Sequence, residues 1–93
     1  MSQEITVEVA LFGAFRRYGN APVAVTVVAG SPAAEVKRQF GAALAAGKDA
    51  ATADAITALL ASSALADDRQ VFTDDALIHQ GGSFAILPPV CGG

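Results

Sequence analysis

The chain has 93 residues and a formal net charge of −3, and 53% of its residues are hydrophobic while 16% are charged. This length fits one domain, and the high apolar content with low charge excludes an intrinsically disordered chain. A net negative charge opposes binding to nucleic-acid phosphates, so we expect no nucleic-acid partner. One cysteine and one histidine cannot form an internal disulfide or a zinc site, so we expect no metal.

The sequence also argues against a membrane protein. It has no apolar stretch of about 18–20 residues that would span a bilayer. Its start, Met1-Ser2-Gln3-Glu4, lacks the basic region of a signal peptide. A lone cysteine suits a reducing compartment. We therefore expect a cytoplasmic protein without a membrane partner.

Residues 5–28 show the pattern of a β-hairpin. Apolar residues alternate with polar or small ones at 5–12, which is typical of a half-buried strand, and the same alternation returns at 23–27. The connection at 13–20 contains a Gly-Asn pair, which favours a turn. The side chains expected in the core are Ile5, Val7, Val9, Leu11, Val23, Val25 and Val27.

A helix is predicted to follow Gly30. Ser31 would cap its free N–H groups, and Pro32 suits the first helical position. Glu35 falls in the first turn, where the helix dipole favours an acidic residue. The helix should end near Gly47. Its apolar face would consist of Val36, Phe40, Ala43 and Leu44.

The Ala-rich segment that comes next has a weak pattern. Residues 54–60 fit a short helix, and residues 56–60 also fit the beginning of a strand, so both interpretations stay open. Strands are expected at 59–65 and at 70–72, on either side of a turn at Asp67-Asp68.

The last part of the body is predicted to be a loop and a strand. The loop at 73–80 would be anchored by buried Leu77 and Ile78, and a turn at 81–82 would lead into a final strand at 83–87. Phe84 and Ile86 would lie on one face of that strand, and Ala85 and Leu87 on the other.

This order of elements predicts an α+β domain in which the main helix packs across one face of a sheet. The first and last strands are the most apolar, so we expect both to be central. The opposite face would carry exposed apolar side chains, and such an area marks a protein-binding surface. The residues expected on that face are Phe12, Val28, Phe72 and Leu87.

The chain ends in Leu87-Pro88-Pro89-Val90-Cys91-Gly92-Gly93. Two prolines end a strand and favour an extended path, and the terminal glycines make the tip as narrow as a polypeptide can be. We therefore expect a domain at 1–87 and an extended tail at 88–93. Two terminal glycines occur by chance in only about 0.5% of chains. Such a tail suits insertion into another enzyme's active site, where the Gly93 carboxylate would be activated.

The ending LPPVCGG, whose Leu87 also completes the apolar strand FAIL, resembles the MoaD/ThiS family of ubiquitin-like sulfur carriers, most of all the small subunit of molybdopterin synthase. The opening ITVEVALFGAFRR is similar to that family's first strand, followed by a phenylalanine and an arginine. The segment from Leu59 to Ile78 can be aligned without gaps with the family's third and fourth strands. Residues 47–58 match poorly and suggest a small insertion.

The resemblance implies a ubiquitin-like β-grasp fold, with a mixed sheet, one main helix across one face and an extended C-terminal tail. It implies that an E1-like adenylyltransferase of the MoeB/ThiF type adenylates the Gly93 carboxylate with ATP and Mg. A sulfur donor would then give a thiocarboxylate. The tail would enter a large synthase subunit of the MoaE type, where sulfur passes to cyclic pyranopterin monophosphate. The chain itself would bind no cofactor tightly, and its partners would supply the catalytic side chains.

The candidate site residues follow from the tail and from this resemblance. Gly93 would carry the reacting carboxylate. The remaining tail residues are Gly92, Cys91, Val90, Pro89 and Pro88, and the candidate partner-binding residues are Leu87, Phe72, Val71 and Arg16. Some of them have a second interpretation: Leu87, Phe72 and Val71 as ordinary core, Arg16 as a solvated loop charge, and Cys91 as a small hydrophobe rather than a reactive thiol. His79 is interpreted as an exposed loop histidine.

Two other functions remain open. A related carrier would use the same tail chemistry for thiamine, cysteine or another sulfur-containing metabolite. A ubiquitin-like protein modifier would instead be joined to lysines, and the lysines available for building chains are Lys37 and Lys48.

Overall fold

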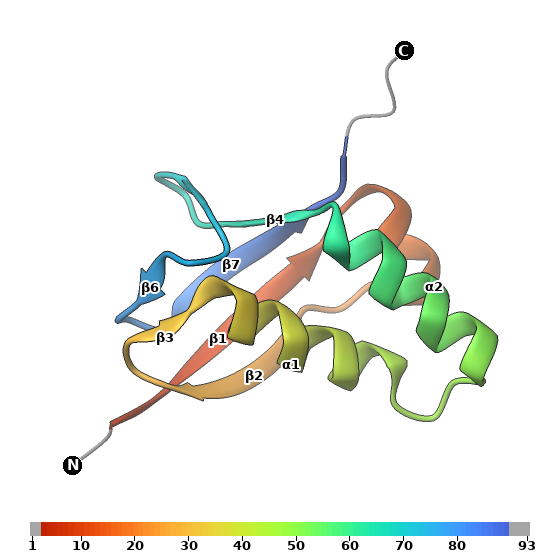
Figure 1. Cartoon of the computed structure of the whole chain (residues 1–93), viewed down its shortest axis with the longest axis horizontal. Helices are drawn as coiled ribbons and strands as arrows, with labels where there is room; N and C mark the ends of the chain where they lie inside the picture. Colours follow the sequence, from red (N-terminus) through yellow and green to blue (C-terminus); the bar gives the residue numbers. More distant parts are fainter. Residues whose placement is uncertain (1–2, 90–93) are drawn as a thin grey trace.

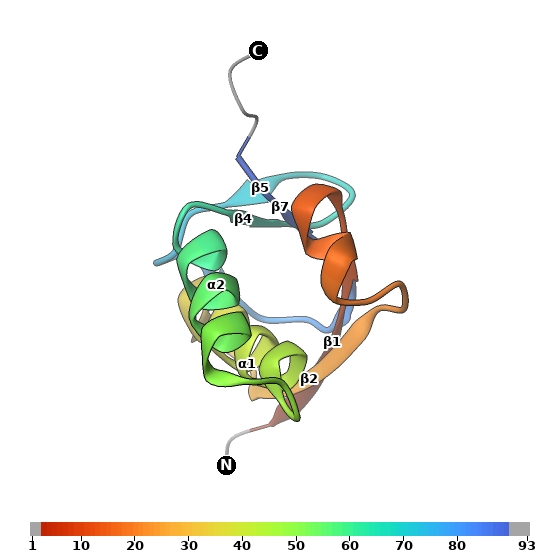
Figure 2. The same ribbon diagram turned by 90° about the vertical axis from the view of Figure 1, so that its right-hand side faces the viewer.

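The computed structural model describes residues 3–89 and shows a curved five-stranded sheet with α1 packed across its concave face and α2 beside α1 (Figures 1 and 2). The expected α+β class is confirmed. The elements in chain order are β1 (Glu4–Leu11), the 3₁₀ helix η1 (Gly13–Tyr18), β2 (Val23–Val28), β3 (Ser31–Pro32), α1 (Ala33–Ala45), α2 (Ala50–Ala61), β4 (Ala64–Ala66), β5 (Val71–Phe72), β6 (Leu77–Ile78) and β7 (Gly82–Leu87).

The strand order of the main sheet is β2-β1-β7-β4-β5, so the first and last strands are inner strands as expected. β1 runs parallel to β7, and the other neighbouring pairs are antiparallel. β3 and β6 form a separate two-stranded sheet. Since β1 and β7 are parallel, both strands end at the same edge of the sheet, by which we mean the edge across the strand ends and not an outer strand (Figure 1).

The predicted hairpin and its core residues are confirmed. β1 and β2 pair antiparallel, with Val7 opposite Val25 and Ile5 opposite Val27. Successive side chains of a strand point to opposite faces of the sheet, so every second residue faces α1. Val7 and Val9 lie on that face and are fully buried. In β7 the predicted facing also holds, because Phe84 and Ile86 are buried while Leu87 is exposed.

The connection after β1 contributes a core residue that its sequence did not reveal. Residues 13–18 form η1, whose first turn is closed by the Phe15 N–H donating to the Phe12 carbonyl at 3.1 Å. This turn directs Phe15 inward, where it is fully buried and meets Phe40 of α1 edge-to-face at 5.7 Å between ring centroids. The loop therefore closes one end of the core.

The prediction that Ser31 caps the main helix is wrong. The Ser31 hydroxyl donates to the Val28 carbonyl at 2.6 Å, and Pro32 is the cap residue rather than the first helical residue. The first N–H groups of α1 are bound by a neighbouring loop instead: Ala33 donates to the Ala76 carbonyl at 2.8 Å, and Ala34 to the Asp74 carbonyl at 2.9 Å. Backbone carbonyls thus replace a side-chain cap.

The Ala-rich segment is a helix, and the strand expected at 59–65 is wrong over residues 59–63. The Asp49 carboxylate accepts a hydrogen bond from the Thr52 N–H at 2.8 Å and so begins α2, which continues to Ala61. Only residues 64–66 form the strand β4. Leu60 packs close to α1, where a Cβ at Gly41 would lie 2.8 Å from its Cδ2 atom. Gly41 therefore allows the two helices to approach.

Two smaller expectations about burial are also wrong. Ala43 is exposed, because the buried face of α1 runs through Val36, Phe40 and Leu44 and does not extend to it. Leu77 is 55% exposed, because it alternates with buried Ile78 in the short strand β6. His79 is exposed, as expected.

Lys37 is a buried lysine, with only 6% of its surface exposed. Its ammonium group donates to the Ser63 carbonyl at 2.8 Å and to the Asp74 carboxylate at 2.9 Å. These bonds join α1 to the end of α2 and to the loop before β6. A charge in this position is stable because both partners compensate for lost hydration.

Within residues 3–89, neither helix is long and apolar enough to cross a membrane.

Replacing Phe15 with alanine should destabilise the fold by about 3–5 kcal/mol, because it removes a fully buried ring and leaves a cavity beside Phe40. The matched control is Phe12→Ala, since Phe12 is 41% exposed and its loss should cost less than about 1 kcal/mol. Chemical denaturation of both variants measures the difference. Equal losses would show that the two rings are buried alike.

Candidate functional site

The face of the sheet that points away from α1 carries an apolar area next to the end of β7. Cross-strand pairing aligns Ala10, Ala85, Ala66 and Val71 in one row across β1, β7, β4 and β5. In the next row, Leu87 pairs with Ala64. Directly paired residues point to the same side of a sheet, so both rows lie on this face.

We call the area formed by Phe12, Ala64, Val71, Ala85 and Leu87 the outer apolar patch. Its three large side chains are substantially exposed: Val71 at 60%, Phe12 at 41% and Leu87 at 37%. Three large exposed hydrophobics on one side of so small a domain make this surface a candidate binding site for another protein.

The outer apolar patch is confined to one end of the sheet. Toward the other end, the same face carries Thr6 and Glu8 of β1 and Thr26 of β2. Val28 also lies on this face, exposed and paired with Glu4 at the far end of the hairpin. Its expected position is therefore confirmed, but it is separated from the patch by polar residues.

Phe72 lies on the opposite face, contrary to expectation. It pairs with buried Leu65, and its ring stacks on Phe84 with 5.7 Å between centroids. Val71 and Leu87 therefore share a surface, whereas Phe72 is half-buried on the helix-covered side. A shift of one residue along a strand reverses the face, which explains the error.

Arg16 lies beside the outer apolar patch. Its guanidinium carbon is 5.7 Å from the centroid of the Phe12 ring. Its Nε atom donates to the Leu11 carbonyl at 3.3 Å. The side chain thus places a positive charge at the rim of the patch, where it can pair with an acidic group on a partner.

The tail begins at the same edge. Leu87 ends β7, and half-buried Pro88 and exposed Pro89 lead away from the body (Figures 1 and 2). Pro88 contacts the start of η1, where Gly13 leaves room for its ring. The predicted tail residues Val90, Cys91, Gly92 and Gly93 lie outside the described residues. A protein bound to the patch would be adjacent to the point where the tail starts.

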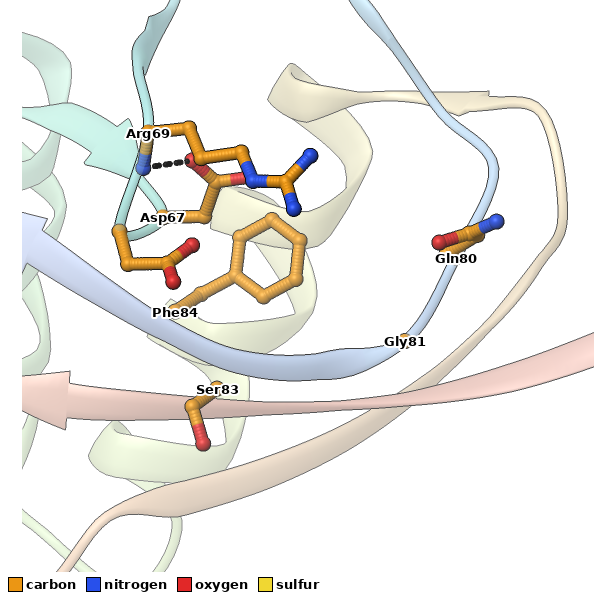
Figure 3. A pocket seen from close by; sticks show the side chains of 7 residues that line it. Asp67, Arg69, Gln80, Gly81, Ser83 and Phe84 are labelled. Carbon is orange, nitrogen blue, oxygen red and sulfur yellow. Dashed lines mark hydrogen bonds between the residues drawn. The ribbon is translucent and has the colours of Figure 1, made fainter.

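A polar pocket lies at the opposite end of β7 (Figure 3). Its carboxylate Asp67 accepts hydrogen bonds from the backbone N–H groups of Arg69 at 2.8 Å and Gln70 at 2.9 Å. These bonds close the turn between β4 and β5, so Asp67 has a structural function there. The pocket is lined by the start of β7, around Ser83 and Phe84, whereas the tail follows the end of that strand.

The shifted pKa values belong to the helices. Hydrogen bonds from Arg38, and then from Gln39, lower the pKa of Glu35 to about 2. Hydrogen bonds from Thr52 lower the pKa of Asp49 at the start of α2. Both carboxylates stabilise helical turns. Among residues 3–89, no three His, Cys, Asp or Glu side chains come together as metal ligands.

The fold is similar to that of a solved structure named Caldiarchaeum subterraneum ubiquitin. The two share 12% sequence identity with a TM-score of 0.57, and the match covers 98% of this chain and 100% of that chain. No family model matches the sequence, and no curated protein does. The chain therefore has the ubiquitin-like β-grasp fold that the family resemblance implied, and at this identity the similarity concerns the fold alone.

The two lysines should differ strongly in reactivity toward an acylating reagent. Lys48 is exposed, with its ammonium group bonded to the Leu44 carbonyl, whereas Lys37 is buried and has two partners. We expect Lys37 to react at least about tenfold more slowly, because it must wait for local opening. Peptide mass spectrometry after brief acetylation measures this, and denaturant should equalise the two rates. Equal rates in the folded protein would contradict the buried position of Lys37.

Proposed function

We propose that this ubiquitin-like chain is a sulfur carrier of the MoaD/ThiS type, in which Gly93 supplies the reacting carboxylate. An adenylyltransferase would activate that carboxylate with ATP and Mg, and a sulfur donor would convert it into a thiocarboxylate. The thiocarboxylate would then give its sulfur to cyclic pyranopterin monophosphate during molybdopterin synthesis.

One observation carries this proposal. The segment LPPVCGG begins at the end of the central strand β7, where the exposed side chains of Leu87, Val71 and Phe12 form the outer apolar patch. Recognition and tail entry would therefore occur at the same edge. A partner that binds the patch would receive the tail without any rearrangement of the domain.

The chemistry needs no side chain of this protein. A carboxylate oxygen attacks the α-phosphorus of ATP and pyrophosphate leaves, which gives an acyl adenylate. A sulfur nucleophile at the oxidation level of sulfide then attacks the acyl carbon and forms a C–S bond. The bond between the acyl carbon and the phosphate oxygen breaks, and AMP leaves. The product thiocarboxylate is a better nucleophile than the original carboxylate. The partner enzymes would provide the catalytic groups, and this chain would provide reach and recognition.

The large synthase subunit of the MoaE type is the partner proposed for sulfur transfer. Burial of Val71, Leu87 and Phe12 against it would provide most of the binding energy, since apolar side chains at the centre of an interface contribute most. Arg16 at the rim would orient the complex through an acidic group. A carrier for thiamine, cysteine or another metabolite would use the same surface with a different large partner.

A ubiquitin-like protein modifier is the second candidate, because the fold is similar to that of an archaeal ubiquitin and the sequence ends in Gly-Gly. A modifier forms an isopeptide bond between its terminal carboxylate and a lysine. In a chain of such modifiers, one copy would be joined to a lysine of the next. Because Lys37 is buried, Lys48 is the lysine side chain in the described residues that can accept that bond.

Incubation with a cognate adenylyltransferase, ATP, Mg and a sulfur donor should raise the mass by about 16 Da, because one oxygen is replaced by sulfur. Deletion of Gly93 should abolish this gain while the melting temperature stays unchanged. Intact-mass spectrometry detects both results. No mass change with an enzyme that adenylates a known carrier would refute the carrier proposal, and conjugates at lysine would support the modifier instead.

Val71→Asp should weaken binding to a MoaE-type subunit at least about tenfold, because it places a charge in the outer apolar patch. The matched control is Thr26→Asp, which adds the same charge to an exposed position on the same face, away from the patch. Titration calorimetry with the purified subunit compares them. Similar affinities for both variants would show that the partner binds elsewhere, and no binding of the unmodified protein would favour a carrier for another pathway.

A further inference from the structure

The start of the tail is packed against the start of η1. Leu11 of β1 pairs with Ile86 of parallel β7, so the segments that follow the two strands leave the sheet side by side. Gly13 and Pro88 meet there: a Cβ at Gly13 would lie 2.7 Å from Cγ of Pro88, 3.6 Å from Cδ and 3.9 Å from Cβ. The first of these distances is too short for two carbon atoms, so any side chain at Gly13 would displace the ring.

The ring can yield only by a change of pucker, which moves its Cγ atom less far than a change of rotamer moves the end of an open side chain. Proline closes its side chain onto its own backbone nitrogen and fixes φ near −65°. A displaced Pro88 ring therefore carries the backbone of Pro88 with it. Pro89 follows directly and also has a restricted φ, and it disfavours the helical conformation for Pro88. A change of direction at Pro88 is thus passed on along the chain instead of being absorbed.

We infer that Gly13 is a positioning residue, whose missing side chain gives Pro88 the space that sets the direction in which the tail leaves the domain. The kinetic consequence of this inference rests on the proposed function. A tail that enters another enzyme must present its carboxylate at the reacting atom, and a misplacement of about 1 Å can reduce a rate by about 10²-fold. Gly13 would act on the reaction through Pro88, without contact with the reacting atoms.

Gly13 has a second reason to be glycine, which the test must separate from the first. Its φ is +55°, in the left-handed region where side chains are unfavourable. Gly47 provides the matched control, because its φ is +80° and a Cβ there would meet nothing within 4 Å. Gly13→Ala and Gly47→Ala therefore both introduce backbone strain, but only the first introduces a clash with Pro88.

The first measurement is the rate of adenylation by a cognate adenylyltransferase. The release of pyrophosphate serves as the readout. We expect Gly13→Ala to lower kcat at least about tenfold while KM changes less than about twofold, because the outer apolar patch remains intact. Gly47→Ala should keep both constants within about twofold of the unmodified protein. Equal effects of the two substitutions would overturn the inference, since strain alone would then explain the loss.

A double-mutant cycle tests whether Gly13 acts through the ring. Pro88→Ala removes Cγ and Cδ, and of the three atoms nearest to a Cβ at Gly13 only the Cβ atom at 3.9 Å would then remain. Gly13→Ala should therefore cause no further loss of kcat when Pro88 is already alanine. Losses that multiply would show that the two residues act independently. If Gly13→Ala alone does not fold, the double variant should fold, because the clash with Cγ is removed; a double variant that also fails to fold would overturn the inference.

A second readout needs no partner enzyme. Cys91 is the only cysteine in the sequence, so a nitroxide attached to it would broaden the NMR signals of backbone amides near the tail. We expect the set of broadened amides to change in Gly13→Ala and to stay the same in Gly47→Ala. An unchanged set in Gly13→Ala would overturn the inference. A changed set, in a protein that no adenylyltransferase activates, would support the inference and refute the proposed function.

Discussion

The parallel pairing of β1 with β7 is the constraint on which the rest of the molecule depends. It brings the first and last strands together at the centre of the sheet and makes them end at one edge. The segment after β1 then supplies Gly13 and Arg16 to the same edge at which Pro88 leaves β7. Because this pair is central, the tail starts from the part of the sheet that is held by neighbours on both sides.

The two faces of the sheet divide the tasks of stability and recognition. The concave face holds the core around Phe15 and Phe40, and buried Lys37 joins the helices to the adjacent loop. The outer face can therefore expose Val71 and Leu87 without loss of the core. Under the proposed function, such a protein would contribute a surface and an end of chain to a reaction whose catalytic groups belong to its partners.

Long periodic segments were predictable from the sequence, whereas features that depend on distant contacts were not. The alternation in β1, β2 and β7 was long enough to identify the strands and their buried faces. The start of α1 was misassigned because its N–H groups bind the Ala76 and Asp74 carbonyls of a remote loop. The tail and Leu87 were recognisable as candidate site residues, but the side on which Phe72 lies depended on register. The contact of Gly13 with Pro88 joins opposite ends of the chain and left no local signal.

The proposed function requires that the end of this chain carries sulfur for other enzymes. The most direct measurement is the intact mass of the protein isolated from its own cells under non-reducing, thiol-free conditions. We expect a chain that ends at Gly93, with a fraction heavier by about 16 Da that loses this mass on hydrolysis. A mature chain with residues beyond Gly93, or one joined through Gly93 to lysines of other proteins and never found as the thiocarboxylate, would contradict it.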